Sequence, residues 1–236
     1  MSEGIGKALA NAIRDEPVLA AEARGRHVFQ NSNRRGVFTL LTENPCMGVG
    51  MLASITGLSK NSVKWHLEAL VKAGYLVRFG AGRGNVFYPE GLISQETAGL
   101  FLVINSPRQS SLFRGIVARP GLSQRDIATI HGKSRQWVAA SMKTLEQAGL
   151  VSGVADGAHT RYYPTRLLPD MADGFYRASK DFGDYMLKKL GREGGAAPAV
   201  VKHGLDRILV EVGHQSSRFN IEIGVNPYLT CLGCKI

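Results

Sequence analysis

The sequence has few cysteines and no long hydrophobic run, and both shortages narrow the classes of protein that it could be. Its 236 residues include only Cys46, Cys231 and Cys234. An odd, small number of cysteines without framework spacing favours a reducing compartment. No apolar run approaches the roughly 20 residues that a membrane-spanning helix needs, and Asp-Glu-Pro at residues 15–17 interrupts any secretory signal pattern. We therefore expect a cytoplasmic protein without a membrane partner.

Acidic residues are scarce relative to basic ones. The chain has 29 Lys and Arg against 19 Asp and Glu, which gives a net charge of +10 and a pI of about 9.7. The excess is concentrated in two segments, because residues 32–90 hold seven basic and three acidic residues and residues 107–167 hold nine and three. Two basic segments favour a polyanionic partner such as nucleic acid.

The same two segments are related by an internal repeat with an offset of 75 residues and no gap. The residues that recur 75 positions later are Phe38, Pro45, Ala53, Ile55, Gly57, Ser59, Leu70, Ala73, Gly74, Tyr88, Pro89 and Leu92. Apolar, turn and capping positions stay in phase together. Each copy is as long as one small domain, so the repeat indicates a domain duplication rather than a solenoid.

Each copy predicts three helices followed by a β-hairpin, from apolar spacing, glycine turns and serine caps. In the first copy we expect helices over residues 34–42, 49–56 and 60–73 and a hairpin of 75–79 with 86–88. In the second we expect helices over 110–118, 124–131 and 135–148 and a hairpin of 150–154 with 161–163. A short helix, a glycine turn, a capped helix and a hairpin follow one another in a winged helix-turn-helix domain.

The segment SKNSVKWHLEALVKAGYLV, at residues 59–77, resembles the recognition-helix signature of the ArsR/MarR-like winged-helix superfamily, especially its archaeal branches. The residues that match are Ser59, Val63, Trp65, His66, Leu67, Leu70, Ala73 and Gly74. The second copy, SRQWVAASMKTLEQAGLV, lacks the His-Leu pair and has Ser141 and Met142 instead. The resemblance implies a transcriptional regulator with two tandem winged domains.

The expected fold is mainly α with small β-hairpin wings, an α+β class. The domains that we expect are a helical N-terminal arm over 1–31, winged domains over 32–92 and 107–167, a linker helix over 93–106, and a C-terminal region over 168–236. In the last, we expect a long amphipathic helix over 168–190, a linker over 191–198 and a hairpin of 207–211 with 218–223. This region would support dimerisation or sense an effector.

The candidate DNA-binding residues fall into two groups. Side chains early in a recognition helix can reach base edges in the major groove, where Asn pairs with adenine and Lys or Arg with guanine. These candidates are Lys60, Asn61, Lys64 and Trp65 in the first copy and Arg135 and Gln136 in the second. The candidates for phosphate contact, on the wings and the first helix, are Arg34, Arg35, Arg83, Asn85, His159 and Arg161. For Trp65, packing is an equally good interpretation.

No catalytic constellation is present. The glycine-rich segment 80–84 lies in a hairpin, and no Gly-Lys-Ser/Thr follows it. Cys231 and Cys234 form a lone CxxC, which is weak evidence for zinc because zinc needs four ligands. We expect no enzyme activity, cofactor or metal, and a homodimer on double-stranded DNA with any effector left open. The alternative is a protein-interaction, chromosome or replication factor that uses its winged domains to bind other proteins.

Overall fold

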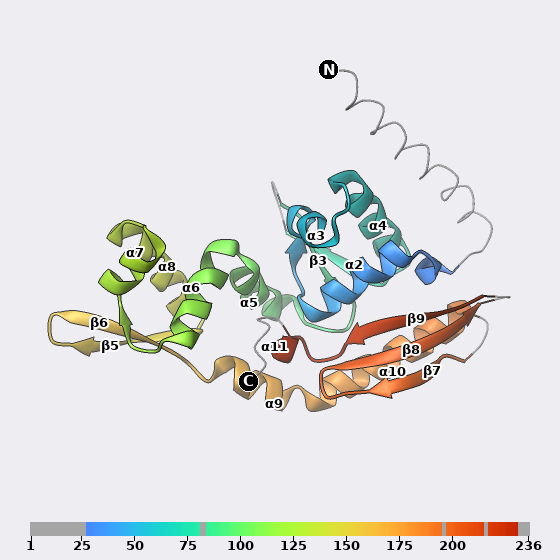
Figure 1. Ribbon diagram of the computed structural model, residues 1–236. Coiled ribbons are helices and arrows are strands. Elements are labelled where there is room, and N and C mark those ends of the chain that lie inside the picture. The colour runs from blue at the N-terminus through green and yellow to red at the C-terminus, as the bar shows by residue number, and fades with distance from the viewer. Residues whose placement is uncertain (1–26, 81–83, 195–196, 215–216, 231–236) are drawn as a thin grey trace, which may run out of the picture.

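The computed structural model describes residues 27–80, 84–194, 197–214 and 217–230. Within them, short helices alternate with three antiparallel sheets of three strands each. Figure 1 shows the second copy of the repeat set to one side of the first, while the C-terminal sheet lies along the first copy. The predicted α+β class with small β wings is confirmed. We refer to residues 32–92 as the first unit and to residues 107–167 as the second unit.

The first unit holds the elements that the sequence predicts. Its elements are α2 (Ser32–Glu43), β1 (Met47–Gly48), α3 (Val49–Thr56), α4 (Lys60–Lys72), β2 (Leu76–Phe79) and β3 (Val86–Pro89). The α2 helix begins where the side chain of Asn31 accepts a hydrogen bond from the backbone N–H of Arg34, and it buries Val37, Phe38 and Leu41 at helical spacing. The sheet order is β1-β3-β2.

The second unit repeats this order of elements. They are α6 (Pro107–Ala118), β4 (Leu122–Ser123), α7 (Gln124–His131), α8 (Arg135–Gln147), β5 (Val151–Asp156) and β6 (His159–Pro164). Ser123 and Asp126 form a capping box at the start of α7. The sheet order β4-β6-β5 repeats that of the first unit, with longer wing strands.

A short helix and a buried aromatic residue connect the flanking segments to the first unit. The linker helix α5 (Gln95–Asn105) lies within the predicted range and buries Ala98, Phe101 and Ile104. Before α2, η1 (Val28–Gln30) is one turn of 3-10 helix. Its Phe29 is fully buried against Phe38 and Tyr75, with ring centroids 5.0 and 4.6 Å away. Most of the predicted N-terminal arm lies outside the described residues.

The C-terminal region differs from its prediction in two respects. Its elements are α9 (Leu167–Gly174), α10 (Tyr176–Gly194), β7 (Ala199–His203), β8 (Arg207–His214), β9 (Ser217–Gly224) and α11 (Pro227–Thr230). The single helix predicted over 168–190 is wrong, because the helix is interrupted at Phe175. The predicted linker over 191–198 starts too early, because α10 continues to Gly194, and the third strand β7, which begins at Ala199, was not predicted. The predicted hairpin is present as β8 and β9.

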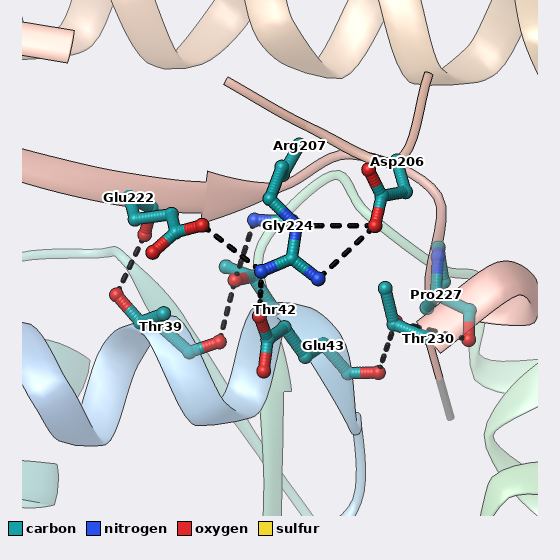
Figure 2. Close-up of polar contacts among 9 residues, drawn as sticks. All are labelled: Thr39, Thr42, Glu43, Asp206, Arg207, Glu222, Gly224, Pro227 and Thr230. Atoms are coloured by element: carbon teal, nitrogen blue, oxygen red, sulfur yellow. Dashed lines mark hydrogen bonds and ion pairs between the residues drawn. The ribbon is translucent and has the colours of Figure 1, made fainter. Parts of the chain in front are cut away.

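The C-terminal sheet is attached to the outer side of α2, as Figure 2 shows. The hydroxyl of Thr39 donates to the carbonyl of Glu222 at 2.6 Å, and that of Thr42 accepts from the N–H of Gly224 at 2.8 Å. At position 224, a Cβ would lie 3.0 Å from the carbonyl of Thr42, so glycine is what allows this approach. The end of β9 is therefore packed directly on backbone.

An ion-pair cluster closes the same contact. The guanidinium of Arg207 lies 3.1 Å from the carboxylate of Glu43, 2.9 Å from Glu222 and 3.0 Å from Asp206 (Figure 2). Burial raises the pKa of Glu43, while Arg207 opposes that rise. We call these four residues, with Thr39, Thr42 and Gly224, the α2 clamp. It joins the C-terminal region to the first unit alone.

Candidate nucleic-acid interface

The turn before α4 holds the geometry of a helix-turn-helix. Gly57 ends α3 with a φ of 70°, a left-handed conformation that favours glycine. Two residues later the side chain of Ser59 accepts a hydrogen bond from the N–H of Ser62 at 3.0 Å and caps α4. On the inner side of α4, Val63, Leu67 and Leu70 are fully buried. The start of α4 is therefore fixed in direction by its cap and by its core face.

Three of the candidate base-reading residues lie on the open face of this helix. Lys60, Asn61 and Lys64 are exposed in the first two turns of α4. Their pattern follows from helical spacing, because Val63 and Leu67 point the opposite way into the core. The structure thus brings two ammonium groups and a carboxamide to one edge, a donor-rich surface that can hydrogen-bond to base edges and phosphates.

The structure corrects the phosphate contact predicted for Arg34 and supports the packing interpretation of Trp65. Arg34 is 1% exposed; its Nη1 donates to the carbonyl of Val28 at 2.9 Å, and its guanidinium lies 4.7 Å from the centre of the Trp65 ring. Trp65 is half-buried between this cation and the ring of His66, 4.8 Å away. A guanidinium held this deeply has no path to a phosphate, so Arg34 serves the interior of the unit, and Trp65 packs against it.

Arg35 is also engaged within the protein. Its Nη1 donates to the carbonyls of Phe29 and Gln30 at 2.7 and 3.0 Å, and its guanidinium lies 5.2 Å from the ring of Phe219 on β9. Partial burial lowers its pKa. The phosphate contact predicted for Arg35 is not supported, because its donors already join η1 to the C-terminal sheet.

His66 belongs to α4 and lies on the face of that helix that is buried in the core. It is 3% exposed, and burial together with the charge of Arg34 lowers the pKa of its imidazole to about 4. The ring is therefore neutral at physiological pH. This environment gives His66 a packing role rather than a role in proton transfer.

The first wing is tied to α4 at its base. β2 and β3 pair in antiparallel register as far as Phe79 and Val86, and Arg78 forms an ion pair with Glu68 on α4. Asn85 is exposed and directly precedes β3. Arg83 lies outside the described residues. The pairing of Arg78 on β2 with Glu68 on α4 was not predicted from the sequence.

The second unit has a comparable helix start. Gly132 ends α7 with a φ of 59°, and Ser134 caps α8 by accepting from the N–H of Trp137 at 3.2 Å. Arg135 and Gln136 are both exposed in its first turn. The predicted base-reading positions therefore face outward in this copy as well.

A basic pocket lies between this helix start and the second wing. It has a volume of about 250 Å³ and is lined by Ser123, Gln124, Arg125, Arg135, Ala158, His159 and Thr160. Two guanidinium groups and an imidazole line a space that the N-termini of two helices also approach, so the pocket can hold an anionic group such as a phosphate. Arg125 lines this pocket because the N-terminal end of α7 lies beside the second wing.

Arg161 differs from its neighbours in this wing. Its Nε lies 2.5 Å from the carboxylate of Asp156, and its Nη1 donates to the carbonyl of Gly121 at 3.0 Å. The hydrogen bond and charge of Asp156 raise the pKa of Arg161. Arg161 is half-buried and closes the hairpin, which leaves His159 as the more open of the two predicted wing contacts.

In the part of the chain that the structure describes, no group of three or more His, Cys, Asp or Glu side chains could hold a metal ion. Cys231 and Cys234, the weak zinc candidates, lie outside that part. None of the described helices combines the length and apolarity that crossing a bilayer requires.

Comparison with known families gives one match, over residues 30–77, to a family described as winged helix-turn-helix DNA-binding. The matched segment runs from the start of α2 through α4 into β2. This part of the chain is similar to winged helix-turn-helix DNA-binding domains. The candidate residues Lys60, Asn61 and Lys64 lie within it, on the helix that such domains insert into DNA.

Other comparisons add little. No curated protein matches the chain. Among solved structures, ScpB from Mycobacterium tuberculosis is 17% identical over 58% of this chain and 92% of its own, with a TM-score of 0.25. The DIP2311 protein from Corynebacterium diphtheriae is 18% identical over 56% of this chain and 26% of its own, with a TM-score of 0.23. Scores this low do not establish a shared overall arrangement.

Proposed function

We propose that this protein is a sequence-specific transcriptional regulator that binds double-stranded DNA as a homodimer, with both units acting as tandem winged domains of the ArsR/MarR-like type. The observation that carries the proposal is the exposed triad Lys60, Asn61 and Lys64 at the capped start of α4. A helix whose opposite face is fixed in a core can enter the major groove without losing its direction.

The two units would divide the work of recognition. In the first, Asn61 would pair with an adenine and Lys60 or Lys64 with a guanine, while the wing meets the backbone. In the second, Arg135 and Gln136 would reach base edges, and the pocket beside His159 would hold a phosphate. Phosphate contacts would supply affinity that falls as salt rises, and base contacts would supply the preference for one sequence.

The test starts by selecting bound fragments from a random DNA library, followed by affinity measurements across a salt series. On the selected site, we expect Lys60→Ala, Asn61→Ala and Lys64→Ala each to weaken binding about 5- to 100-fold, because each removes one base or phosphate contact. Asn61→Ala should also relax the preference at one base pair. Lysine variants should reduce the salt dependence of the binding constant as well.

Lys72 provides the matched control. It is exposed on the same helix, at its C-terminal turn, and Lys72→Ala changes the charge by the same amount as Lys60→Ala. It should leave affinity within about twofold, since only residues near the helix start reach the bases. Selection of no preferred sequence, or equal losses at Lys60 and Lys72, would remove the basis for specific recognition by α4.

A further inference from the structure

Exposed apolar side chains gather at one place in the C-terminal region. Leu205, Tyr176 and Val201 are the most exposed large apolar residues of the described chain, at 81, 73 and 58%, and Val200 beside them is 44% exposed. We call these four residues the apolar rim. Monomeric proteins seldom leave such a cluster in water, so a rim of this kind marks a surface that another molecule covers.

Most of the apolar rim borders a groove. Three rim residues, Tyr176, Val200 and Leu205, line a space of about 530 Å³ between α10 and the strands β7 and β8. Its deeper wall includes Ile208 and Val225, which are nearly fully buried. The groove exists because α10 packs on β8, whereas all five residues of the edge strand β7 are exposed. One margin of the sheet therefore has no cover within the described chain.

The form of the edge favours side-chain packing over strand addition. β7 is the outer strand of its sheet, but its register shifts between Val200 and Lys202, which is a β-bulge. Bulges protect edges against pairing with a further strand. An occupant of the groove would therefore contact the apolar rim through its own side chains.

Two charges in the groove suggest what that occupant is. Lys180 and Asp184 both line it, lie one turn apart on α10 and are exposed. No hydrogen bond or ion pair of either side chain occurs among the described residues. A two-fold axis beside α10 would place Lys180 against Asp184 of the partner subunit, and the reverse pair would form by symmetry. Such self-complementarity is what an isologous dimer interface requires.

We propose that the groove and the apolar rim form the homodimer interface, with Leu205 of each copy packed in the groove of the other. At its far end, α10 contacts Tyr75 in the turn between α4 and β2. Glu193 accepts a hydrogen bond from the hydroxyl of Tyr75 at 2.8 Å, and the ammonium of Lys189 lies 4.6 Å from the Tyr75 ring. One helix thus joins the interface to the turn that follows α4. A dimer through this interface would hold two α4 helices at a fixed spacing on DNA. That consequence rests on the proposed function.

The first experiment measures the mass of the full-length protein by sedimentation over a concentration series without DNA. Wild type should approach twice the 25.5 kDa of one chain. Leu205→Glu should raise the dimer dissociation constant about 100-fold, because each copy loses a buried leucine and gains a charge there. Ile130→Glu is the matched control, since Ile130 is also exposed, at 45%, but lies on α7. It should leave the mass unchanged.

A charge-reversal series tests the pairing directly. Lys180→Asp and Asp184→Lys should each raise the dissociation constant about fivefold at low salt, and the double variant should restore it. All side chains changed are exposed, so circular dichroism should match wild type. A wild type that stays monomeric, a Leu205→Glu variant that stays dimeric, or a double variant weaker than both single ones would overturn the interface.

The same variants keep this inference separate from the proposed function. A monomeric Leu205→Glu protein that still binds half of the selected DNA site would support both. A wild-type dimer that binds no DNA would leave the interface standing and remove the regulator. A wild-type monomer that binds DNA specifically would do the opposite, because the groove would then have another occupant.

Discussion

The two repeat units share an order of elements but hold their capped helices, α4 and α8, in different ways. In the first, the guanidinium of Arg34 is buried under Trp65 and beside His66. In the second, the corresponding layer is made by Arg108, which is exposed, lies 4.3 Å from the Trp137 ring and donates from Nε to Ser141 at 2.7 Å. Each unit therefore has a cation on a tryptophan, but only one of them is sealed from water.

The two tryptophans also occupy different positions along their helices. Trp137 lies in the first turn of α8, beside Arg135 and Gln136, whereas Trp65 lies almost one turn further along α4. The second unit also lacks the α2 clamp, since the C-terminal sheet packs on α2. The comparison indicates that the first unit is held by both the buried Arg34 layer and the α2 clamp, whereas the second unit is held mainly by its own core.

The largest expected effect comes from removing the two cations. Arg34→Ala should destabilise the first unit by about 4 kcal/mol, because it removes a buried cation–π contact and a hydrogen bond and leaves a cavity. Arg108→Ala should cost the second unit only about 1 kcal/mol, since water replaces its contacts. Hydrogen exchange of the α4 and α8 amides, measured in both variants, reports each unit separately.

Equal losses of stability in Arg34→Ala and Arg108→Ala would contradict the proposed difference between the two units. The variant Arg34→Lys tests the nature of the contact, because lysine keeps the charge but cannot stack its head group on Trp65 in the same way. We expect this variant to remain clearly less stable than wild type. A near-normal stability would mean that charge alone, rather than the planar contact, maintains the layer.

The second expected effect depends on pH. Because the pKa of His66 is lowered to about 4 in the folded protein, the unfolded chain takes up its proton first, near pH 6.5. The stability that neutral His66 provides is complete above pH 6.5 and is lost as the pH falls to 4, by about 3 kcal/mol. Denaturant unfolding followed by Trp65 fluorescence, in a Trp137→Phe background, measures it.

Ser141 occupies the equivalent place in the second unit and does not titrate in this range. Exchange of the α8 amides should therefore change less than that of the α4 amides between pH 6.5 and 4. His66→Gln should flatten the pH dependence of the first unit while lowering its stability at neutral pH. A slope that survives this substitution would have to come from another group.

Helix positions were predictable from the sequence because they depend on local signals. The caps Ser59 and Ser134 and the glycines after α3 and α7 fix where α4 and α8 begin, so the predicted starts agree with the structure. The exposure of Lys60 and Asn61 follows from the same spacing. Arg34 could not be assigned in this way, because its burial depends on Trp65, 31 positions later, and on Val28.

Contacts between distant segments were the part that sequence reasoning missed. The α2 clamp joins Glu43 to Arg207, and nothing near either residue indicates a partner so far along the chain. The strand β7 follows a glycine- and alanine-rich stretch that is typical of a linker. Neither the α2 clamp nor the strand β7 is indicated by local sequence signals, because each depends on contacts between distant segments.

The smallest expected effect tests what the two units have in common. Gly57 and Gly132 have φ values of 70° and 59°, and a Cβ at either position would meet no atom within 4 Å. Alanine would therefore cost only the left-handed backbone conformation, about 1 kcal/mol in each unit. Calorimetry and hydrogen exchange should find the same loss for Gly57→Ala and Gly132→Ala. A much larger loss at Gly57 would show that the α2 clamp also stiffens the turn, and the difference between the units would then extend to the helix-turn-helix itself.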